Sequence, residues 1–167
     1  MIRFIGAVLI FLAASSFGIY LSDNIKRKRE RLETEVKILK EIALMIRWNS
    51  LTLHEIAEEL FNNKSFSEFE LIKNLNVNCS KIRSFPETWE KSVLSVKNIC
   101  NEEKKLLFEV GAVLGTTDKE GQLSAIELFS TRLEKMAEIE GEKYKIKGKM
   151  YRSLGVTAGA MIGIIII

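Results

Sequence analysis

The chain has 167 residues and a mass of 19.0 kDa, a length that suits one domain. Apolar residues make up 47% and charged residues 28%, which excludes a disordered chain, a collagen-like fibre and a disulfide scaffold. A net charge of +3 gives no strong field for holding nucleic acid. All but one of the charged residues lie within 23–152. Both ends are therefore apolar, and a freely soluble monomer is not expected.

The first predicted element is an apolar helix at the N-terminus. Residues 4–22 carry no charge, and as an α-helix they are about 28 Å long, close to the thickness of a bilayer core. A cleaved signal peptide is the alternative, with residues 13–16 imitating a cleavage site. A signal peptide carries its basic residues before the apolar run, whereas here the basic cluster at 26–31 follows it. We therefore expect residues 1–22 to be a retained transmembrane anchor.

Residues 23–152 are predicted to form a compact bundle of five to six helices, because apolar residues repeat there at spacings of three and four. The first helix is expected to continue from the anchor. Capping-box patterns at Thr52–Glu55 and Ser65–Glu68 predict two further helix starts. A loop is favoured after the second of these helices by three asparagines, Asn74, Asn76 and Asn78.

The second half of this domain carries three more boundary signals. Ser84 followed by Pro86 predicts another helix start, since proline is tolerated in a first helical turn. Gly115 is placed to end the fifth helix in the left-handed conformation. Asp118 is placed to cap a sixth, long helix that runs towards the C-terminal apolar segment.

The last predicted element is a second apolar segment. Residues 154–167 reach only about 21 Å as a helix, which is short for a full span, and a buried strand or helix of the core is the alternative. Three glycines fall on one helical face and suit close helix packing in lipid: Gly155, Gly159 and Gly163. We expect residues 153–167 to be a C-terminal transmembrane segment. Basic clusters adjoin both apolar segments from the central side, so the positive-inside rule predicts a cytoplasmic central domain.

Nothing in the sequence points to catalysis. His54 is the only histidine, and no phosphate-binding glycine loop occurs, so we expect no enzymatic activity, no cofactor and no metal site. Two cysteines, Cys79 and Cys100, lack the spacing of a zinc site and are expected to be free thiols.

Four residues are candidates for binding a protein partner. Arg47 and Trp48 end the first long helix, where a tryptophan could fill the bundle core or anchor a partner; core filling is the expected role. Asp118 and Gln122 share a helical face. Capping explains Asp118, whereas no structural duty is apparent for Gln122.

Four segments form a distinctive combination: MIRFIGAVLIFLAASSFGIYL at 1–21, EIALMIRWNSLTLHEIAEEL at 41–60, LGTTDKEGQL at 114–123 and KMYRSLGVTAGAMIGIIII at 149–167. Together they resemble the stage III sporulation protein AB family of endospore-forming bacteria. The resemblance covers nearly the whole chain and is weakest between residues 62 and 82. One departure is visible, because Leu51-Thr52-Leu53 stands where the family usually has Thr-Pro-Leu, which leaves helix initiation to the capping box.

The resemblance implies a non-enzymatic scaffold in the channel between mother cell and forespore, in the mother-cell membrane around the forespore. It extends to the cytoplasmic helical domains of type II secretion and type IV pilus platform proteins, which engage a secretion ATPase. By that analogy the bundle would contact the stage III sporulation protein AA ATPase and other channel proteins, with Arg47, Trp48, Asp118 and Gln122 as candidate contacts. A membrane-surface module that recruits anionic lipid through the basic clusters is the alternative. Neither nucleic acid nor a small-molecule substrate is expected.

Overall fold

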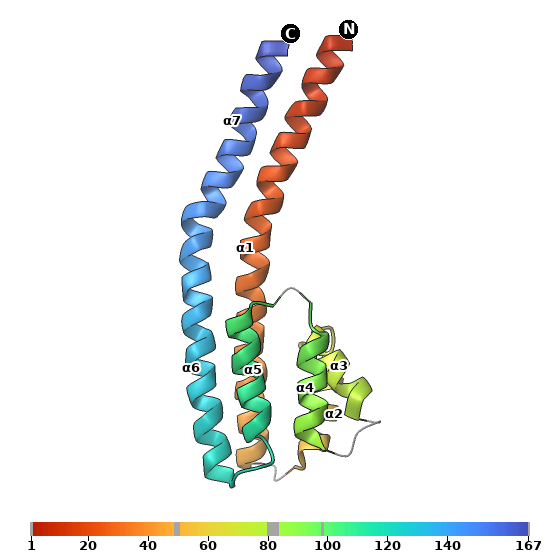
Figure 1. Ribbon diagram of the computed structural model, residues 1–167, viewed down its shortest axis with the longest axis vertical. Helices are drawn as coiled ribbons and strands as arrows, with labels where there is room; N and C mark the ends of the chain where they lie inside the picture. The colour runs from red at the N-terminus through yellow and green to blue at the C-terminus, as the bar shows by residue number, and fades with distance from the viewer. Residues whose placement is uncertain (1, 49–50, 80–83, 98, 167) are drawn as a thin grey trace. The chain divides into compact units, whose positions relative to one another are not determined.

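A computed structural model of the chain describes residues 2–48, 51–79, 84–97 and 99–166 (Figure 1). All secondary-structure elements among these residues are helices, and no strand occurs there, which confirms the predicted all-α class. The elements are α1 (Ile2–Trp48), α2 (Leu53–Asn62), α3 (Glu70–Cys79), α4 (Phe85–Ser95), α5 (Asn101–Val113), α6 (Lys119–Lys143), the π-helix η1 (Tyr144–Gly148) and α7 (Lys149–Ile166).

The helices form two compact units. The hairpin unit comprises Met1–Glu33 and Lys135–Ile167, and the bundle unit comprises Thr34–Glu134. The bundle unit is therefore shorter at both ends than the domain expected at 23–152. The difference arises because α1 and α6 are continuous helices that take part in both units. The membrane boundaries expected at residues 22 and 153 depend on lipid and stay predictions.

The core of the bundle unit is centred on Trp89 of α4. The indole is fully buried, and its Nε1 donates a hydrogen bond to the Leu107 carbonyl of α5 at 2.7 Å. Gly111, one turn further along α5, leaves room for the indole ring. The other helices also contribute fully buried aliphatic side chains to this unit, including Ile42, Ile56, Leu60, Leu71, Ile72, Leu75, Leu107 and Leu133.

Most helix boundaries follow the sequence signals. The capping box at Thr52 is present: its hydroxyl accepts from the Glu55 N–H, and the Glu55 carboxylate accepts from the Thr52 N–H at 2.7 Å. Pro86 lies in the first turn of α4. Gly115 follows α5 with φ of 79°, as predicted for a left-handed helix end.

Two boundary predictions in the middle of the chain are wrong. The helix expected to start at Ser65 starts instead at Glu70, because Asn63 caps the Ser65 N–H and a series of turns carries the buried Phe66 into the core. The asparagines expected to form a loop lie within α3. Burial of Leu71, Ile72 and Leu75 outweighs the weak helix propensity of asparagine.

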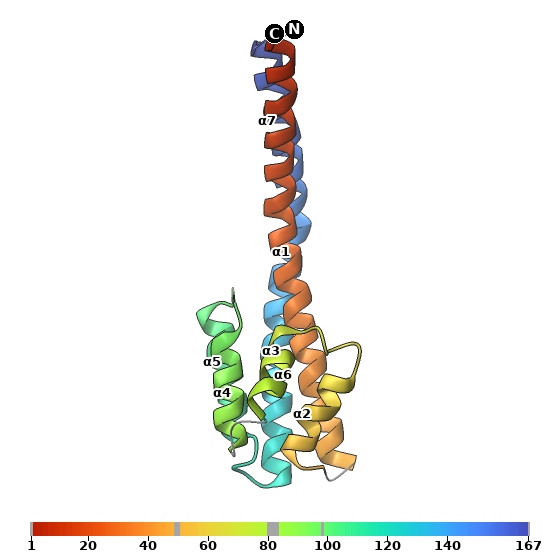
Figure 2. The ribbon, with the colours of Figure 1, turned by 90° about the vertical axis from the view of Figure 1, so that its right-hand side faces the viewer.

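In the hairpin unit the predicted glycine face of α7 packs against α1. A Cβ on Gly155 would lie 2.8 Å from the Ala14 carbonyl oxygen, and one on Gly18 would lie 2.5 Å from the Tyr151 carbonyl oxygen. The backbones can approach this closely only because both residues are glycines. The N-terminal end of α1 and the C-terminal end of α7 lie side by side (Figures 1 and 2).

Below the glycine contact, η1 interrupts the long C-terminal helix, a feature that the sequence did not indicate. Near it Arg152 donates to the buried Ser22 hydroxyl at 3.1 Å, to the Tyr144 hydroxyl at 3.1 Å and to the Asp23 carboxylate at 3.4 Å. These bonds join α1, η1 and α7 where the predicted membrane segments meet the polar part of the chain.

Among the described residues one helix, α1, is long and apolar enough to cross a membrane, near the N-terminus of the chain. This agrees with the predicted N-terminal anchor. The C-terminal span, which includes residues beyond those described, stays a prediction.

Candidate functional site

The four predicted contact residues lie at one end of the bundle unit. Arg47 and Trp48 end α1, while Asp118 and Gln122 stand at the start of α6. Between them Lys119 Nζ donates a hydrogen bond to the Arg47 carbonyl at 2.8 Å. This bond joins two segments 72 residues apart in the chain and brings both predicted pairs together.

Trp48 is exposed over 75% of its surface, so the prediction that it fills the bundle core is wrong. The place of the core tryptophan is taken by Trp89. The Trp48 side chain projects to solvent beside Arg47, which is also exposed and forms no ion pair within the part of the chain that the structure describes. Exposed tryptophan and arginine are the residues most often found at the energetic centres of protein interfaces.

Asp118 and Gln122 have local structural roles. The Asp118 carboxylate accepts from the Gly121 N–H at 3.1 Å, which is the capping role predicted for it. Gln122 Nε2 donates to the Thr117 carbonyl at 2.8 Å, so the glutamine for which the sequence suggested no duty closes the turn before α6.

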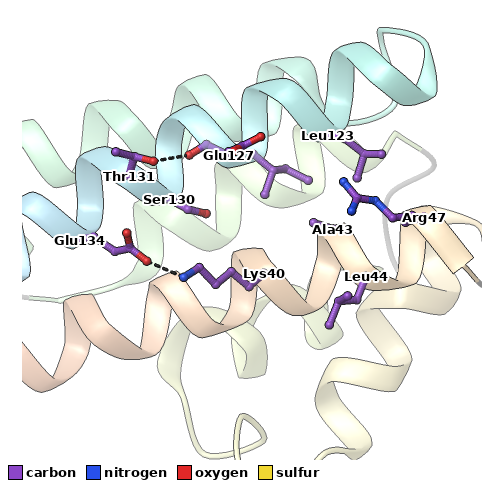
Figure 3. A pocket seen from close by; sticks show the side chains of 10 residues that line it. Lys40, Ala43, Leu44, Arg47, Leu123, Glu127, Ser130, Thr131 and Glu134 are labelled. Carbon is purple, nitrogen blue, oxygen red and sulfur yellow. Dashed lines mark hydrogen bonds and ion pairs between the residues drawn. The ribbon is translucent and has the colours of Figure 1, made fainter.

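A groove of about 520 Å³ runs between α1 and α6 within the bundle unit (Figure 3). We call it the α1–α6 groove. On the α1 side it is lined by Lys40, Ala43, Leu44 and Arg47, and on the α6 side by Leu123, Ile126, Glu127, Ser130, Thr131 and Glu134.

Charge is arranged asymmetrically along the groove. An ion pair between Lys40 and Glu134 bridges the two helices at one end, and the Arg47 guanidinium reaches over the other end from α1 (Figure 3). The exposed Glu127 lies on the α6 wall and, like Arg47, has no ion-pair partner among the residues described.

Ser130 supplies an unsatisfied polar group inside the groove. The residue is only 3% exposed, and its Oγ has no hydrogen-bond partner among the described residues. The adjacent Thr131 behaves differently, since its hydroxyl donates to the Glu127 carbonyl at 2.9 Å. A buried hydroxyl without a hydrogen-bond partner lowers the stability of the folded protein. A polar group bound in the groove would remove this cost by bonding to the Ser130 hydroxyl.

Two carboxyl groups outside the groove have lowered pKa values. Hydrogen bonds from the Thr52 backbone N–H and hydroxyl lower the pKa of Glu55. Burial opposes ionisation of Glu140 in the hairpin unit, but hydrogen bonds and charge from Lys28 at 2.7 Å and Lys143 at 2.9 Å outweigh it and lower its pKa. The ionised Glu55 carboxylate therefore stabilises the start of α2, and the ionised Glu140 carboxylate stabilises the pairing of α6 with α1.

The residues that the structure describes form no metal site and no disulfide. No group of three or more histidine, cysteine or acidic side chains is placed to hold a metal ion there. The His54 ring packs edge-on against Phe85 at 6.2 Å. Cys100 is a free thiol, and the side chain of Cys79 lies outside the described residues.

The groove residues Leu44, Glu127 and Ser130 were missed by reasoning from the sequence. Leu44 lies off the buried face of α1, roughly opposite Ile42 and Ile46. An apolar residue on the exposed face of a helix is the signal that could have identified it. Ser130 offers no such signal, because its burial depends on packing between helices far apart in sequence.

Comparison with known proteins assigns the chain to a family. The sequence model of the family described as stage III sporulation protein AB matches residues 3–167. Stage III sporulation protein AB of Bacillus subtilis (strain 168) is 24% identical over 167 residues, covering 97% of this chain and 97% of the relative. No solved structure gives a significant match. Because the family model spans nearly the whole sequence, the chain belongs to the stage III sporulation protein AB family.

Proposed function

We propose that this sporulation protein is a non-enzymatic, membrane-anchored scaffold of the mother cell–forespore channel. Its bundle unit would hold a secretion-type ATPase, the stage III sporulation protein AA ATPase, at the membrane. Family membership and the apolar part of α1 indicate membrane association. The basic clusters on the central side of both apolar segments support a bundle facing the mother-cell cytoplasm.

The observation that carries the docking proposal is the exposed Arg47–Trp48 pair at the end of α1. A tryptophan with 75% of its surface in water has no packing role in the bundle unit. Association with a partner would remove the indole from water, which is favourable because it buries apolar surface.

Binding of the purified ATPase to the full chain in lipid nanodiscs tests this function. We expect measurable binding, weakened about tenfold or more by Trp48→Ala. Leu94→Ala is the matched control, since Leu94 is an apolar residue of the same unit exposed over 54% of its surface. Absence of binding to wild-type protein that retains its helical circular dichroism would overturn the proposal.

A second candidate function is recruitment of anionic lipid by the hairpin unit. Exposed lysines lie within and next to the π-helix: among the described residues Lys145, Lys147 and Lys149 form no ion pair. The intervening Ile146 is 72% exposed. A mixed cationic and apolar surface next to a membrane segment suits anionic headgroups, at about 1 kcal/mol per basic residue.

Salt separates the two functions. Anionic lipid retained by the purified protein, counted by native mass spectrometry, should fall at high salt and on replacing the three lysines by glutamine. Docking of the ATPase through a packed interface should largely survive both changes. Equal retention of neutral and anionic lipid would rule out the lipid function.

A further inference from the structure

We propose that the α1–α6 groove receives one α-helix of a protein partner, an amphipathic helix whose apolar ridge is flanked by a carboxylate and a cationic side chain. The inference rests on the proposed docking function for the identity of the partner, and it specifies where and by what chemistry the partner binds. Size, apolar lining, charge and the unsatisfied Ser130 hydroxyl support it.

The geometry of the groove favours a helix. The cavity is bounded by two helices that run alongside each other (Figure 3). A third helix laid between two others can bury side chains at intervals of three and four residues, which is the usual mode of helix-in-groove recognition. A volume of about 520 Å³ accommodates a few side chains of such a ridge.

The lining of the groove is apolar where the ridge would lie. Leu44 has 51% of its surface in water, and Ala43 and Leu123 are half-buried. The buried Ile126 forms part of the α6 wall. Covering Leu44 and its neighbours would remove apolar surface from water, which is the main favourable term in such an association.

The charges of the groove specify the flanking residues of the partner. Lys40 and Glu134 satisfy each other. Arg47 and Glu127 have no such partner among the described residues, although both line the groove. Complementary charge therefore requires a carboxylate opposite Arg47 and a cation opposite Glu127.

Ser130 supplies the independent indication that something binds. Its hydroxyl is buried, lines the groove and has no described hydrogen-bond partner. A polar side chain of an inserted helix would satisfy this hydroxyl. Ser130→Ala therefore distinguishes binding from packing: it should leave the thermal stability of the free protein equal or higher, yet weaken partner binding about threefold to tenfold.

Binding of the full chain in nanodiscs to the purified ATPase is the first test. Arg47→Glu and Leu44→Glu should each weaken binding about tenfold or more. Their controls are Lys37→Glu, an exposed cation of α1 outside the groove, and Leu128→Glu, an apolar residue of α6 exposed over 50% of its surface. Both controls should stay within about twofold of wild type. If the wild type binds and Leu44→Glu binds equally well, the groove inference is wrong, while the docking function, which Trp48→Ala tests separately, stands.

If wild-type protein does not bind the ATPase, the docking function fails and the groove is tested by itself. A photo-crosslinking amino acid at position 44 of the full chain in sporulating cells, with mass spectrometric sequencing of the linked peptide, identifies the occupant. A peptide from another protein with helical periodicity and an acidic residue supports the inference, provided that Arg47→Glu abolishes the crosslink. Crosslinks only to a second copy of this chain, or none above those from position 128, overturn it.

Discussion

At the scale of single residues, Gly111 fixes how the core of the bundle unit closes. A Cβ at this position would lie 2.3 Å from Cδ1 of the buried Trp89, and the indole cannot retreat because it is also bonded to the Leu107 carbonyl. We predict that Gly111→Ala lowers the free energy of unfolding by about 1–3 kcal/mol through overpacking. Thermal unfolding of the full chain followed by circular dichroism measures this. The exposed neighbour Ala112→Ser serves as control, and equal stability of both variants would refute the packing of Trp89 on Gly111.

Thr52 stands where the family usually has a proline, so the start of α2 depends on its side chain. No proline starts α2 here, and the capping box satisfies the backbone N–H groups of Thr52 and Glu55 at the start of that helix. Thr52→Ala is expected to cost about 1 kcal/mol of stability, and Thr52→Ser, which keeps the hydroxyl, a few tenths or less. The same unfolding measurement checks both variants. A loss of equal size in the serine variant would show that the cap is not responsible.

At the scale of elements, the hairpin unit depends on close contact between α1 and α7. A side chain on Gly155 would meet the Ala14 carbonyl and the Gly18 backbone, neither of which can move aside. Gly155→Val is therefore expected to separate the two helices by a few ångströms. Spin labels at positions 16 and 158, in a chain with both native cysteines replaced by serine, report the distance by electron paramagnetic resonance. Gly6→Val is the control because no atom lies within 4 Å of a Cβ there.

The ion pairs of Glu140 make pairing of α1 and α6 in the hairpin unit dependent on pH. Its pKa lies below its ordinary value of 4.5 because Lys28 and Lys143 outweigh the effect of burial. The stabilisation is therefore fully present above the pKa of the unfolded chain, and it is lost as pH falls through the folded-state pKa. We expect the melting temperature to drop from pH 7 to pH 3 more steeply in wild type than in Glu140→Gln. Parallel pH profiles would contradict this role.

Local signals in the sequence predict helix ends well where a single residue caps the helix or sets its backbone conformation. Thr52, Pro86, Gly115 and Asp118 each mark the helix end predicted for them. The π-helix has no comparable signal in the sequence. Its last residue, Gly148, lies against the Tyr144 ring and the Ser22 hydroxyl, a contact that local propensity does not predict.

For the molecule as a whole, the sequence predicted the helical class and an apolar N-terminal helix able to span a membrane. It could not divide the chain into the bundle and hairpin units, because α1 and α6 cross both without a break in helical pattern. The candidate site was only half predictable. Arg47 and Trp48 were found by position, whereas the groove beside them requires the pairing of helices distant in sequence.

The position of Trp48 in the sequence allowed two roles, filling the bundle core or anchoring a partner, and its exposure excludes the first. Its indole is in water, while Trp89 occupies the core. The docking proposal follows from this contrast, and it places the protein between the membrane and a partner in the mother-cell cytoplasm.

The most direct test is the location of the fluorescently tagged ATPase in sporulating cells, measured as the ratio of membrane signal around the forespore to mother-cell cytoplasmic signal. The account predicts that the ATPase lies at this membrane with the wild-type protein. It should become diffuse with full-length Trp48→Ala present at wild-type level, and the Leu94→Ala control should retain the membrane signal. An ATPase that stays at the membrane when the gene for this protein is deleted would contradict the account.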